Sequence, residues 1–307
     1  MIAFIFPGQG SQKINMISDF YDETIVGETF DEASDALSYD MFDLIESNAA
    51  KLNQTEFTQP AILTASIALY RLWQDRTGGV PDLLAGHSLG EYSALVAAEV
   101  LHFKDALKLV AHRGRLMQQA VPEGEGAMAA ILGLNDTQVI EACEKAAQGE
   151  VVSAVNFNSP CQVVIAGQKA AVDRAIESCK ALGAKRALPL PVSVPSHCAL
   201  MKHASELLGH HFADVVWHTP KIPIVHNVDA STHESTEAIE AVLIAQLHNP
   251  VEWVKCVQKL NKLGANKFVE CGPGKVLSGL NKRILPDSSC VSIEDAAGFS
   301  ILEEMMA

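Results

Sequence analysis

The pentapeptide GHSLG, which places Ser88 between two glycines, is the most chemically informative stretch of this 307-residue sequence. It fits the G-x-S-x-G pattern of a nucleophile elbow, in which a tight turn between a strand and a helix presents a serine hydroxyl. The glycines let neighbouring backbone approach without a Cβ clash, and the helix N-terminus that follows favours developing negative charge. We therefore expect Ser88 to be a nucleophile, and the alternative is an ordinary serine in a turn.

A serine nucleophile needs a general base, and the sequence offers eleven histidines. His197 lies in the proline-rich segment PVSVPSHCALM, which we interpret as a loop that opens a helix, a context that suits a site. The alternative is a histidine that caps or packs. His87 adjoins Ser88, but adjacent residues on an elbow usually point apart. The residue types alone leave the choice of base open.

Two further segments carry polar groups that could face a site. FPGQGSQ lacks both the G-x-G-x-x-G pattern and the P-loop lysine, which disfavours a nucleotide site, although a glycine turn after a strand can present backbone amides. AHRGRLM has two arginines two positions apart, so on a helix they do not share a face. An arginine turned into a pocket would pair with a carboxylate, and the alternative is two solvated charges.

Strands that alternate with helices must position these groups. Residues 2–12 are typical of a buried strand that breaks into a glycine loop, and residues 82–101 of a strand, sharp turn and helix. Helical periodicity covers residues 60–78 and 103–121. This alternation predicts an α/β fold with a parallel sheet and helices on its faces. The pattern is least defined after Pro286.

A different order of elements occupies residues 126–192. It predicts βαββαβ, the ferredoxin-like arrangement. We interpret residues 125–192 as a small subdomain inserted into a larger domain that comprises residues 1–124 and 193–307. PEGEG and PLPVSVPS are the predicted hinges.

Composition narrows the classes of partner and compartment. The formal net charge of −14 would repel duplex nucleic acid and anionic membranes on average, and no stretch has the roughly 20 apolar residues of a membrane span. The beginning of the chain does not resemble a signal peptide. Seven scattered cysteines without a CxxC pair indicate a reduced, cytoplasmic setting and no structural zinc site.

Seven segments occur in an order that resembles malonyl-CoA:acyl carrier protein transacylase of type II fatty-acid synthesis, from about residue 2 to about residue 286. They are FPGQGSQ, GHSLGEYSAL, RGRLMQQAVPEGEGAMAAILGL, NFNSPCQVVIAG, LPVSVPSHCALM, QLHNPVEW and ECGPGKVLSGLNKRI. The resemblance implies an α/β-hydrolase-like domain with an inserted ferredoxin-like subdomain. It also implies transfer of malonyl from malonyl-CoA to the phosphopantetheine thiol of acyl carrier protein, through a malonyl-serine ester and without a metal or redox cofactor.

The resemblance assigns the catalytic roles residue by residue. Ser88 is similar to the acyl nucleophile and His197 to the general base and acid. Gln246, in QLHNPV, would offer a carbonyl oxygen to the histidine in place of an acidic residue. The backbone N–H groups of Gln9 and Leu89 would form the oxyanion hole.

The resemblance also implies an acyl pocket. Arg113 of RGRLM would bind the free carboxylate of the malonyl group. Met117 and Asn158 would line the pocket near that end. Variation at the residue before the catalytic histidine, here Ser196, would affect which acyl group is tolerated.

Acyl carrier protein is acidic, so an enzyme with a net charge of −14 needs a local basic patch to meet it. We predict docking by the pairs Lys185–Arg186 and Lys282–Arg283, with Lys275 as a weaker candidate. The alternative is that these are dispersed surface charges. We expect a monomer, because nothing in the sequence indicates an interface helix.

Three other functions compete with this interpretation. A thioesterase or lipase-like esterase could use the same elbow, although Arg113 would then have no carboxylate to bind. A non-catalytic carrier-docking protein could keep the fold, but the serine, histidine, glutamine and arginine are all present. A discrete acyltransferase of a polyketide-type pathway shares the motifs, and the sequence does not decide which carrier protein is served or whether methylmalonyl is accepted.

Overall fold

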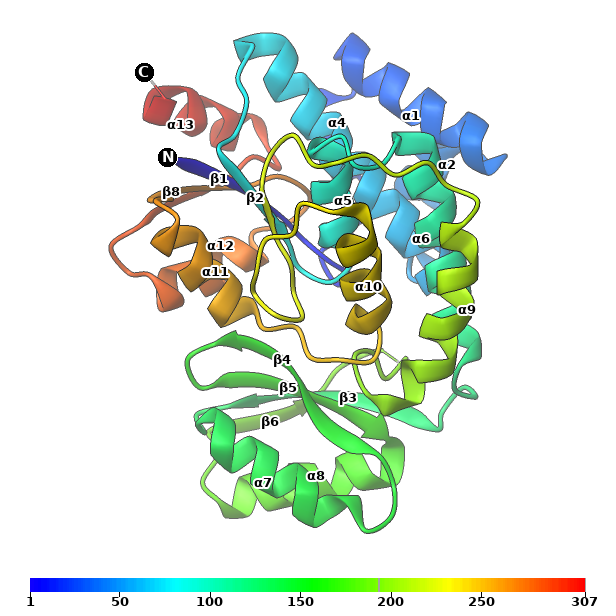
Figure 1. Ribbon diagram of the computed structural model, residues 1–307, viewed down its shortest axis with the longest axis vertical. Coiled ribbons are helices and arrows are strands. Elements are labelled where there is room, and N and C mark those ends of the chain that lie inside the picture. The colour runs from blue at the N-terminus through cyan, green and yellow to red at the C-terminus, as the bar shows by residue number, and fades with distance from the viewer. Residues whose placement is uncertain (193, 307) are drawn as a thin grey trace.

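Two sheets organise the chain, whose computed structural model describes residues 1–192 and 194–306 (Figure 1). Ser193, the predicted first residue of the return to the larger domain, lies outside the described residues. The larger sheet is parallel throughout, in the order β7-β2-β1-β8-β9. Its strands are β1 (Ile2–Phe6), β2 (Leu83–Gly86), β7 (Ile224–Val225), β8 (Lys267–Glu270) and β9 (Ser289–Ser292).

Both faces of the parallel sheet are buried, as the alternation along β1 shows. Phe4 and Phe6 belong to one apolar cluster, whereas Ala3 and Ile5 belong to the other. Helices α11 (Trp253–Lys262) and α12 (Val276–Ile284) cover the second cluster (Figure 1). The first cluster is covered by α1 (Thr24–Leu37), α2 (Met41–Ser47), α3 (Ala49–Leu52), α4 (Thr55–Thr77), α5 (Gly90–Ala97), α6 (Phe103–Gln119), α9 (Lys202–Phe212), α10 (Thr236–Gln246) and α13 (Ala296–Met306).

The smaller sheet is antiparallel, in the order β4-β5-β3-β6, and packs α7 and α8 on one face over its own apolar cluster (Figure 1). This βαββαβ unit confirms the predicted ferredoxin-like arrangement, while the domain boundaries stay a prediction. Its elements are β3 (Gly126–Leu132), α7 (Asp136–Ala147), β4 (Val152–Ser159), β5 (Gln162–Gln168), α8 (Lys169–Ala181) and β6 (Arg186–Pro189).

The smaller sheet is also joined to the larger domain at its middle, in addition to the chain connections at its ends. The N–H of Phe157 in β4 donates to the carbonyl of Val251 at 3.0 Å, and the N–H of Val251 donates to the carbonyl of Val155 at 2.8 Å. Val251 leads into α11. These two backbone hydrogen bonds therefore hold the smaller sheet to the larger domain, in addition to the two predicted hinge segments. We call this link the backbone tether.

Two regions of the chain differ from the expected elements. Helix α4 begins at Thr55, before the predicted start at Pro60, so the proline lies inside the helix. Proline favours the first helical turn, which is why the pattern alone suggested a start at that residue. The tail after Pro286 forms β9 and α13, and Phe299 of α13 packs against Phe20 with 4.9 Å between ring centroids.

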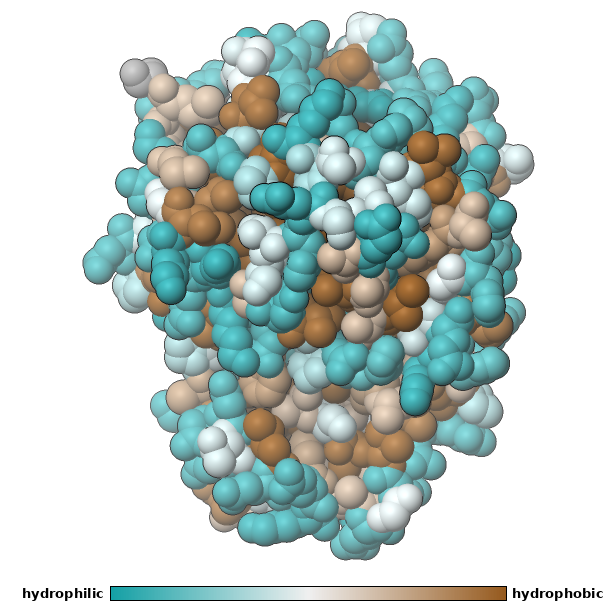
Figure 2. Space-filling view, in the orientation of Figure 1, coloured by the Kyte–Doolittle hydropathy of each residue, from teal (hydrophilic) through white to brown (hydrophobic). Residues whose placement is uncertain are grey.

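Hydrophilic residues cover most of the face seen in Figure 2, and a band of paler and brown residues crosses its lower half, over the smaller sheet. Among residues 1–192 and 194–306, no helix is both long enough and apolar enough to cross a membrane.

The turn between β2 and α5 brings backbone segments closer than any residue with a Cβ could allow. A Cβ placed on Gly86 would lie 1.9 Å from the carbonyl carbon of Gly90, and a Cβ on Gly90 would lie 2.0 Å from the carbonyl oxygen of Phe6. Since neither contact involves a flexible side chain, the elbow is built by close backbone approach.

Gly90→Ala should therefore lower the free energy of unfolding by about 3 kcal/mol, because β1 and α5 must move apart to admit the methyl group. Urea denaturation followed by circular dichroism measures the change. Gly27→Ala is the matched control, since a Cβ on this α1 residue meets nothing within 4 Å. Equal effects at the two glycines would contradict the proposed reason for the elbow glycines.

Candidate active site

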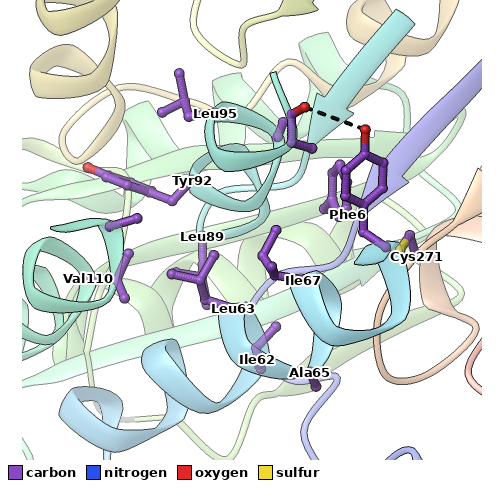
Figure 3. Close-up of a cluster of buried hydrophobic side chains, with 14 of the residues drawn as sticks. Phe6, Ile62, Leu63, Ala65, Ile67, Leu89, Tyr92, Leu95, Val110 and Cys271 are labelled. Carbon is purple, nitrogen blue, oxygen red and sulfur yellow. Dashed lines mark hydrogen bonds between the residues drawn. The ribbon is translucent and has the colours of Figure 1, made fainter. Parts of the chain in front are cut away.

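Ser88 occupies the elbow between β2 and α5 with a left-handed backbone conformation, at φ 53°. Non-glycine residues adopt this region seldom and at a cost. The N–H of Ser88 donates to Asn227 Oδ1 at 2.7 Å. Figure 3 shows Leu89, the next residue, pointing into apolar side chains of α4 that include Leu63 and Ile67. The turn is thus held from both sides, and the serine hydroxyl remains free for contacts in the cleft.

A hydrogen bond of 2.8 Å joins Ser88 Oγ to His197 Nε2. His197 Nδ1 lies 2.7 Å from the main-chain carbonyl oxygen of Gln246, so Nδ1 carries the proton and Nε2 is free to accept one. His87 turns away from the serine, as expected, and its Nε2 lies 2.8 Å from Asn158 Oδ1. The structure therefore joins Ser88 to His197 and not to the adjacent histidine.

Gln246 reaches the histidine through its backbone, and its side chain is engaged elsewhere. The side-chain Oε1 accepts a hydrogen bond from Arg113 at 2.9 Å, and Nε2 donates to the carbonyl of Ser88 at 3.0 Å. Any residue at position 246 could supply a main-chain carbonyl. The need for glutamine thus comes from the amide side chain, which links the arginine to the backbone of the serine.

Burial, and next the charge of Arg113, lower the pKa of His197 to about 3. The hydrogen bond to the Gln246 carbonyl opposes this shift. The imidazole is therefore neutral at physiological pH, which is the form that can take a proton from Ser88.

Arg113 is a buried cation directly beside the nucleophile, with 1% of its surface exposed. One terminal nitrogen donates to Ser88 Oγ at 3.1 Å, and the other donates to Gln59 Oε1 at 2.9 Å. Its Nε is buried without a hydrogen-bond partner among the described residues. Arg115, two positions on, points outward and pairs with Glu56. A buried guanidinium whose partners are neutral is suited to receive an anionic group.

Two backbone N–H groups near the serine are free to stabilise an oxyanion. In the part of the chain that the structure describes, neither Gln9 nor Leu89 donates its N–H to a protein acceptor. Gln9, Ser88 and His197 line one cavity of about 110 Å³. These free donors fit the predicted oxyanion hole, and their role stays a prediction.

The predicted pocket residues differ in their relation to this cavity. Ser196 lines it directly, while Asn158 lines a neighbouring cavity of about 190 Å³ that also touches Gln9. Met117 is buried on α6 one turn beyond Arg113, and its sulfur lies 3.5 Å from Gln59 Nε2. Their effect on the choice of acyl group stays a prediction.

The predicted docking residues are exposed on two elements. Lys185 and Arg186 lie at the start of β6, and Lys282 and Arg283 lie near the end of α12. Arg283 donates to Gln162 Oε1 of β5 at 2.6 Å, which links the two groups of elements. Lys275 pairs with Asp295 at 2.8 Å, so its charge is partly balanced.

Sequence reasoning missed three buried polar residues of the site, namely Gln59, Glu91 and Asn227. Glu91 follows the elbow motif directly, and Asn227 follows the buried strand β7 at the carboxyl edge of the sheet. A polar residue at the end of a buried strand is a detectable signal. Gln59, inside a helix, gave no such signal. Among the described residues, no group of three or more histidine, cysteine or acidic side chains could hold a metal ion.

The comparisons with known proteins agree with this geometry. A family model described as the acyl transferase domain matches residues 3–298. The malonyl CoA-acyl carrier protein transacylase of Escherichia coli strain K12 is 54% identical over 305 residues, covering 99% of both chains. The enzyme of the same name from Haemophilus influenzae is 54% identical over 307 residues, covering 99% of this chain and 98% of its own length.

Solved structures lead to the same family. The crystal structure of an acyl carrier protein S-malonyltransferase from Vibrio cholerae has a TM-score of 0.95 at 53% identity, covering 98% of this chain and 99% of its own. A malonyl-transacylase in complex with a type II PKS acyl-carrier protein has a TM-score of 0.97 at 51% identity, with 99% of both chains covered. The chain therefore belongs to the acyl transferase domain family, and within it to the malonyl CoA-acyl carrier protein transacylases.

Proposed function

We propose that this protein transfers the malonyl group of malonyl-CoA to the phosphopantetheine thiol of acyl carrier protein, which supplies fatty-acid chain elongation. The observation that carries the proposal is the distance of 3.1 Å between the Arg113 guanidinium and Ser88 Oγ. A buried cation at the nucleophile selects an acyl group that carries its own carboxylate, and malonyl has that feature. The names of the relatives support the same reaction.

In the first half-reaction, the carboxylate of malonyl-CoA pairs with Arg113. Ser88 Oγ attacks the thioester carbonyl while its proton passes to His197 Nε2. The N–H groups of Gln9 and Leu89 stabilise the oxyanion, for which a single donor is typically worth about 10²–10³ in rate. The C–S bond then breaks, His197 returns the proton to the leaving thiolate, and a malonyl-serine ester remains.

In the second half-reaction, the carrier thiol gives its proton to His197 and its sulfur attacks the ester carbonyl. The C–O bond to Ser88 breaks, and the serine oxygen recovers the proton from the imidazole. Transfer is favoured over hydrolysis to the extent that the acyl-enzyme keeps water out of the cavity that Ser88 and His197 line.

The reaction exchanges one thioester for another without a change in oxidation state, so we propose that neither a metal nor a redox cofactor takes part. We also propose a cytoplasmic location. Support comes from the seven cysteines, all of which carry free thiols in the structure, as is typical of a reducing compartment.

The carrier protein could belong to a polyketide pathway instead of fatty-acid synthesis. The observation that favours this second candidate is the 51% identical malonyl-transacylase described with a type II PKS acyl-carrier protein. Both candidates require the same site and the same acyl-enzyme, and they differ only in the carrier that discharges it.

Brief exposure to malonyl-CoA should add one malonyl group to the protein, because Ser88 forms a covalent ester before the carrier enters. Intact-mass spectrometry detects the adduct, and holo acyl carrier protein added afterwards should remove it. Ser88→Ala should show no adduct. An adduct that water clears as fast as the carrier does would indicate a thioesterase or esterase instead.

Arg113→Ala should lower kcat/KM for malonyl-CoA by roughly 100-fold, because a buried carboxylate would lose its charged partner. Acylation by acetyl-CoA, which has no carboxylate, should change far less. Arg115→Ala is the matched control, since that arginine lies on the same helix and pairs outside the site with Glu56. Equal losses with both acyl donors would contradict the carboxylate role of Arg113.

We further propose that the carrier docks on the basic pairs Lys185–Arg186 and Lys282–Arg283. Both pairs are exposed, and the hydrogen bond from Arg283 to Gln162 connects α12 to the sheet that carries β6. The whole chain has a net charge of −14, so an acidic partner needs such a local positive surface for productive encounter.

Reversing the charge of all four docking residues to glutamate should raise the KM for acyl carrier protein about 10-fold, because rim charges steer the encounter. The KM for malonyl-CoA should stay unchanged in steady-state assays. Reversal of Lys104 and Lys108, which are exposed on α6, introduces half of that change in net charge away from the docking residues and is the control. A parallel rise for both substrates would rule out a specific docking surface.

A further inference from the structure

Glu91, the second residue of α5, is a buried carboxylate that the mechanism above does not use; 1% of its surface is exposed. Its Oε1 accepts a hydrogen bond from His226 Nδ1 at 2.6 Å. Its Oε2 accepts from the N–H of Asn227 at 3.2 Å and from Gln246 Nε2 at 2.8 Å. Burying a carboxylate is costly unless it is fully hydrogen-bonded, and residues from two distant segments of the chain provide the three bonds.

Two of these donors contact the reacting groups directly. Asn227 accepts the N–H of Ser88 at 2.7 Å. Gln246 donates to the carbonyl of Ser88, accepts from Arg113 through Oε1, and holds His197 through its main-chain oxygen. The side chain of Glu91 is therefore one residue removed from the nucleophile, the base and the carboxylate-binding arginine.

The carboxylate decides which way the Gln246 amide faces. An amide has one donor end and one acceptor end. Glu91 Oε2 and the carbonyl of Ser88 are both acceptors, so they hold the NH₂ end, and Oε1 must then face Arg113. A reversed amide would place N–H donors against the guanidinium and break all of these contacts.

Glu91 also supplies negative charge to the surroundings of Arg113. Burial lowers the pKa of the guanidinium, and Tyr92 and Glu91 oppose that shift. Burial raises the pKa of Tyr92 itself, so its phenol is uncharged at neutral pH. Glu91 thus contributes negative charge near the buried arginine, and its Oε1 is also bonded to His226 Nδ1 at 2.6 Å.

We propose that Glu91 is a positioning residue that orients the Gln246 amide, so that the amide oxygen holds the Arg113 guanidinium beside Ser88, and thereby sets the preference for an acidic acyl group. This inference rests on the proposed malonyl transfer. It deepens that function, because it assigns substrate selection to a residue that touches neither substrate nor nucleophile side chain.

Glu91→Gln tests the proposal, since glutamine keeps the shape but loses the charge and one acceptor. Acylation rates with malonyl-CoA and acetyl-CoA are measured by intact mass on wild type and variant. The kcat/KM for malonyl-CoA should fall about 10-fold to 100-fold, the range expected when a buried charged hydrogen bond is lost. The rate with acetyl-CoA should fall less, so the ratio of the two donors should drop.

A double-mutant cycle separates positioning from general loss of structure. In an Arg113→Ala background, Glu91→Gln should leave the malonyl-to-acetyl ratio unchanged, because the residue through which Glu91 acts is gone. Glu270→Gln is the matched control. Its buried carboxylate accepts from the N–H groups of Leu277 and Ser278 at the start of α12, so its loss should cost stability and leave the ratio as in wild type.

The outcomes separate the proposed malonyl transfer from the proposed role of Glu91. Wild type that is not acylated by malonyl-CoA overturns the proposed function and this inference together. Acylated wild type with an unchanged donor ratio in Glu91→Gln overturns the inference alone. If Glu91→Gln does not fold, Glu91→Asp takes its place, because the shortened side chain withdraws the acceptor from Gln246 but keeps the charge. An unchanged ratio in that variant equally overturns the proposal.

Discussion

A buried positive charge beside the nucleophile is the constraint on which this structure depends. A guanidinium removed from water is unfavourable unless its donors and its charge are balanced. The chain meets this need with the amides of Gln59 and Gln246 and with a carboxylate one residue farther away. A carboxylate in direct contact would occupy the place that the substrate must take. The neutral amides of Gln59 and Gln246 next to Arg113, with Glu91 behind them, stabilise the guanidinium and leave it able to bind a substrate carboxylate.

The same positive charge lowers the basicity of the histidine. With Arg113 nearby and burial complete, the pKa of His197 lies far below its ordinary value. Protonation of the imidazole is thus disfavoured before substrate binds. A malonyl carboxylate on Arg113 offsets the guanidinium and makes the imidazole a stronger base at the moment when the acyl group is in place. Thioesters without a carboxylate do not bring this charge, so the electrostatics couple binding to reactivity.

Local signals predicted the elements, whereas contacts between distant segments completed the site. The glycines around Ser88, the helix that carries Arg113 and the βαββαβ order follow from spacing and turn chemistry within short windows. The hydrogen bond between Ser88 N–H and Asn227 joins residues 139 positions apart, so no pattern within a short window of the sequence predicts it. Gln246 was expected to offer the histidine a carbonyl oxygen as hydrogen-bond acceptor, but spacing could not tell main chain from side chain. The start of α4 was predicted at Pro60 and lies at Thr55, because proline is also common in the first turn of a helix.

The backbone tether between β4 and Val251 bears on how such a site can diversify. Main-chain hydrogen bonds are independent of side-chain identity, so substitution cannot easily lengthen them, and they fix the distance between β4 and the segment that leads into α11. New acyl preferences must then arise from the side chains that line the cavity, with the frame held constant. Grafting a foreign inserted subdomain would succeed only where its second strand keeps this register with the segment that leads into α11. The backbone frame therefore changes little, whereas the side chains that select the acyl group can be replaced.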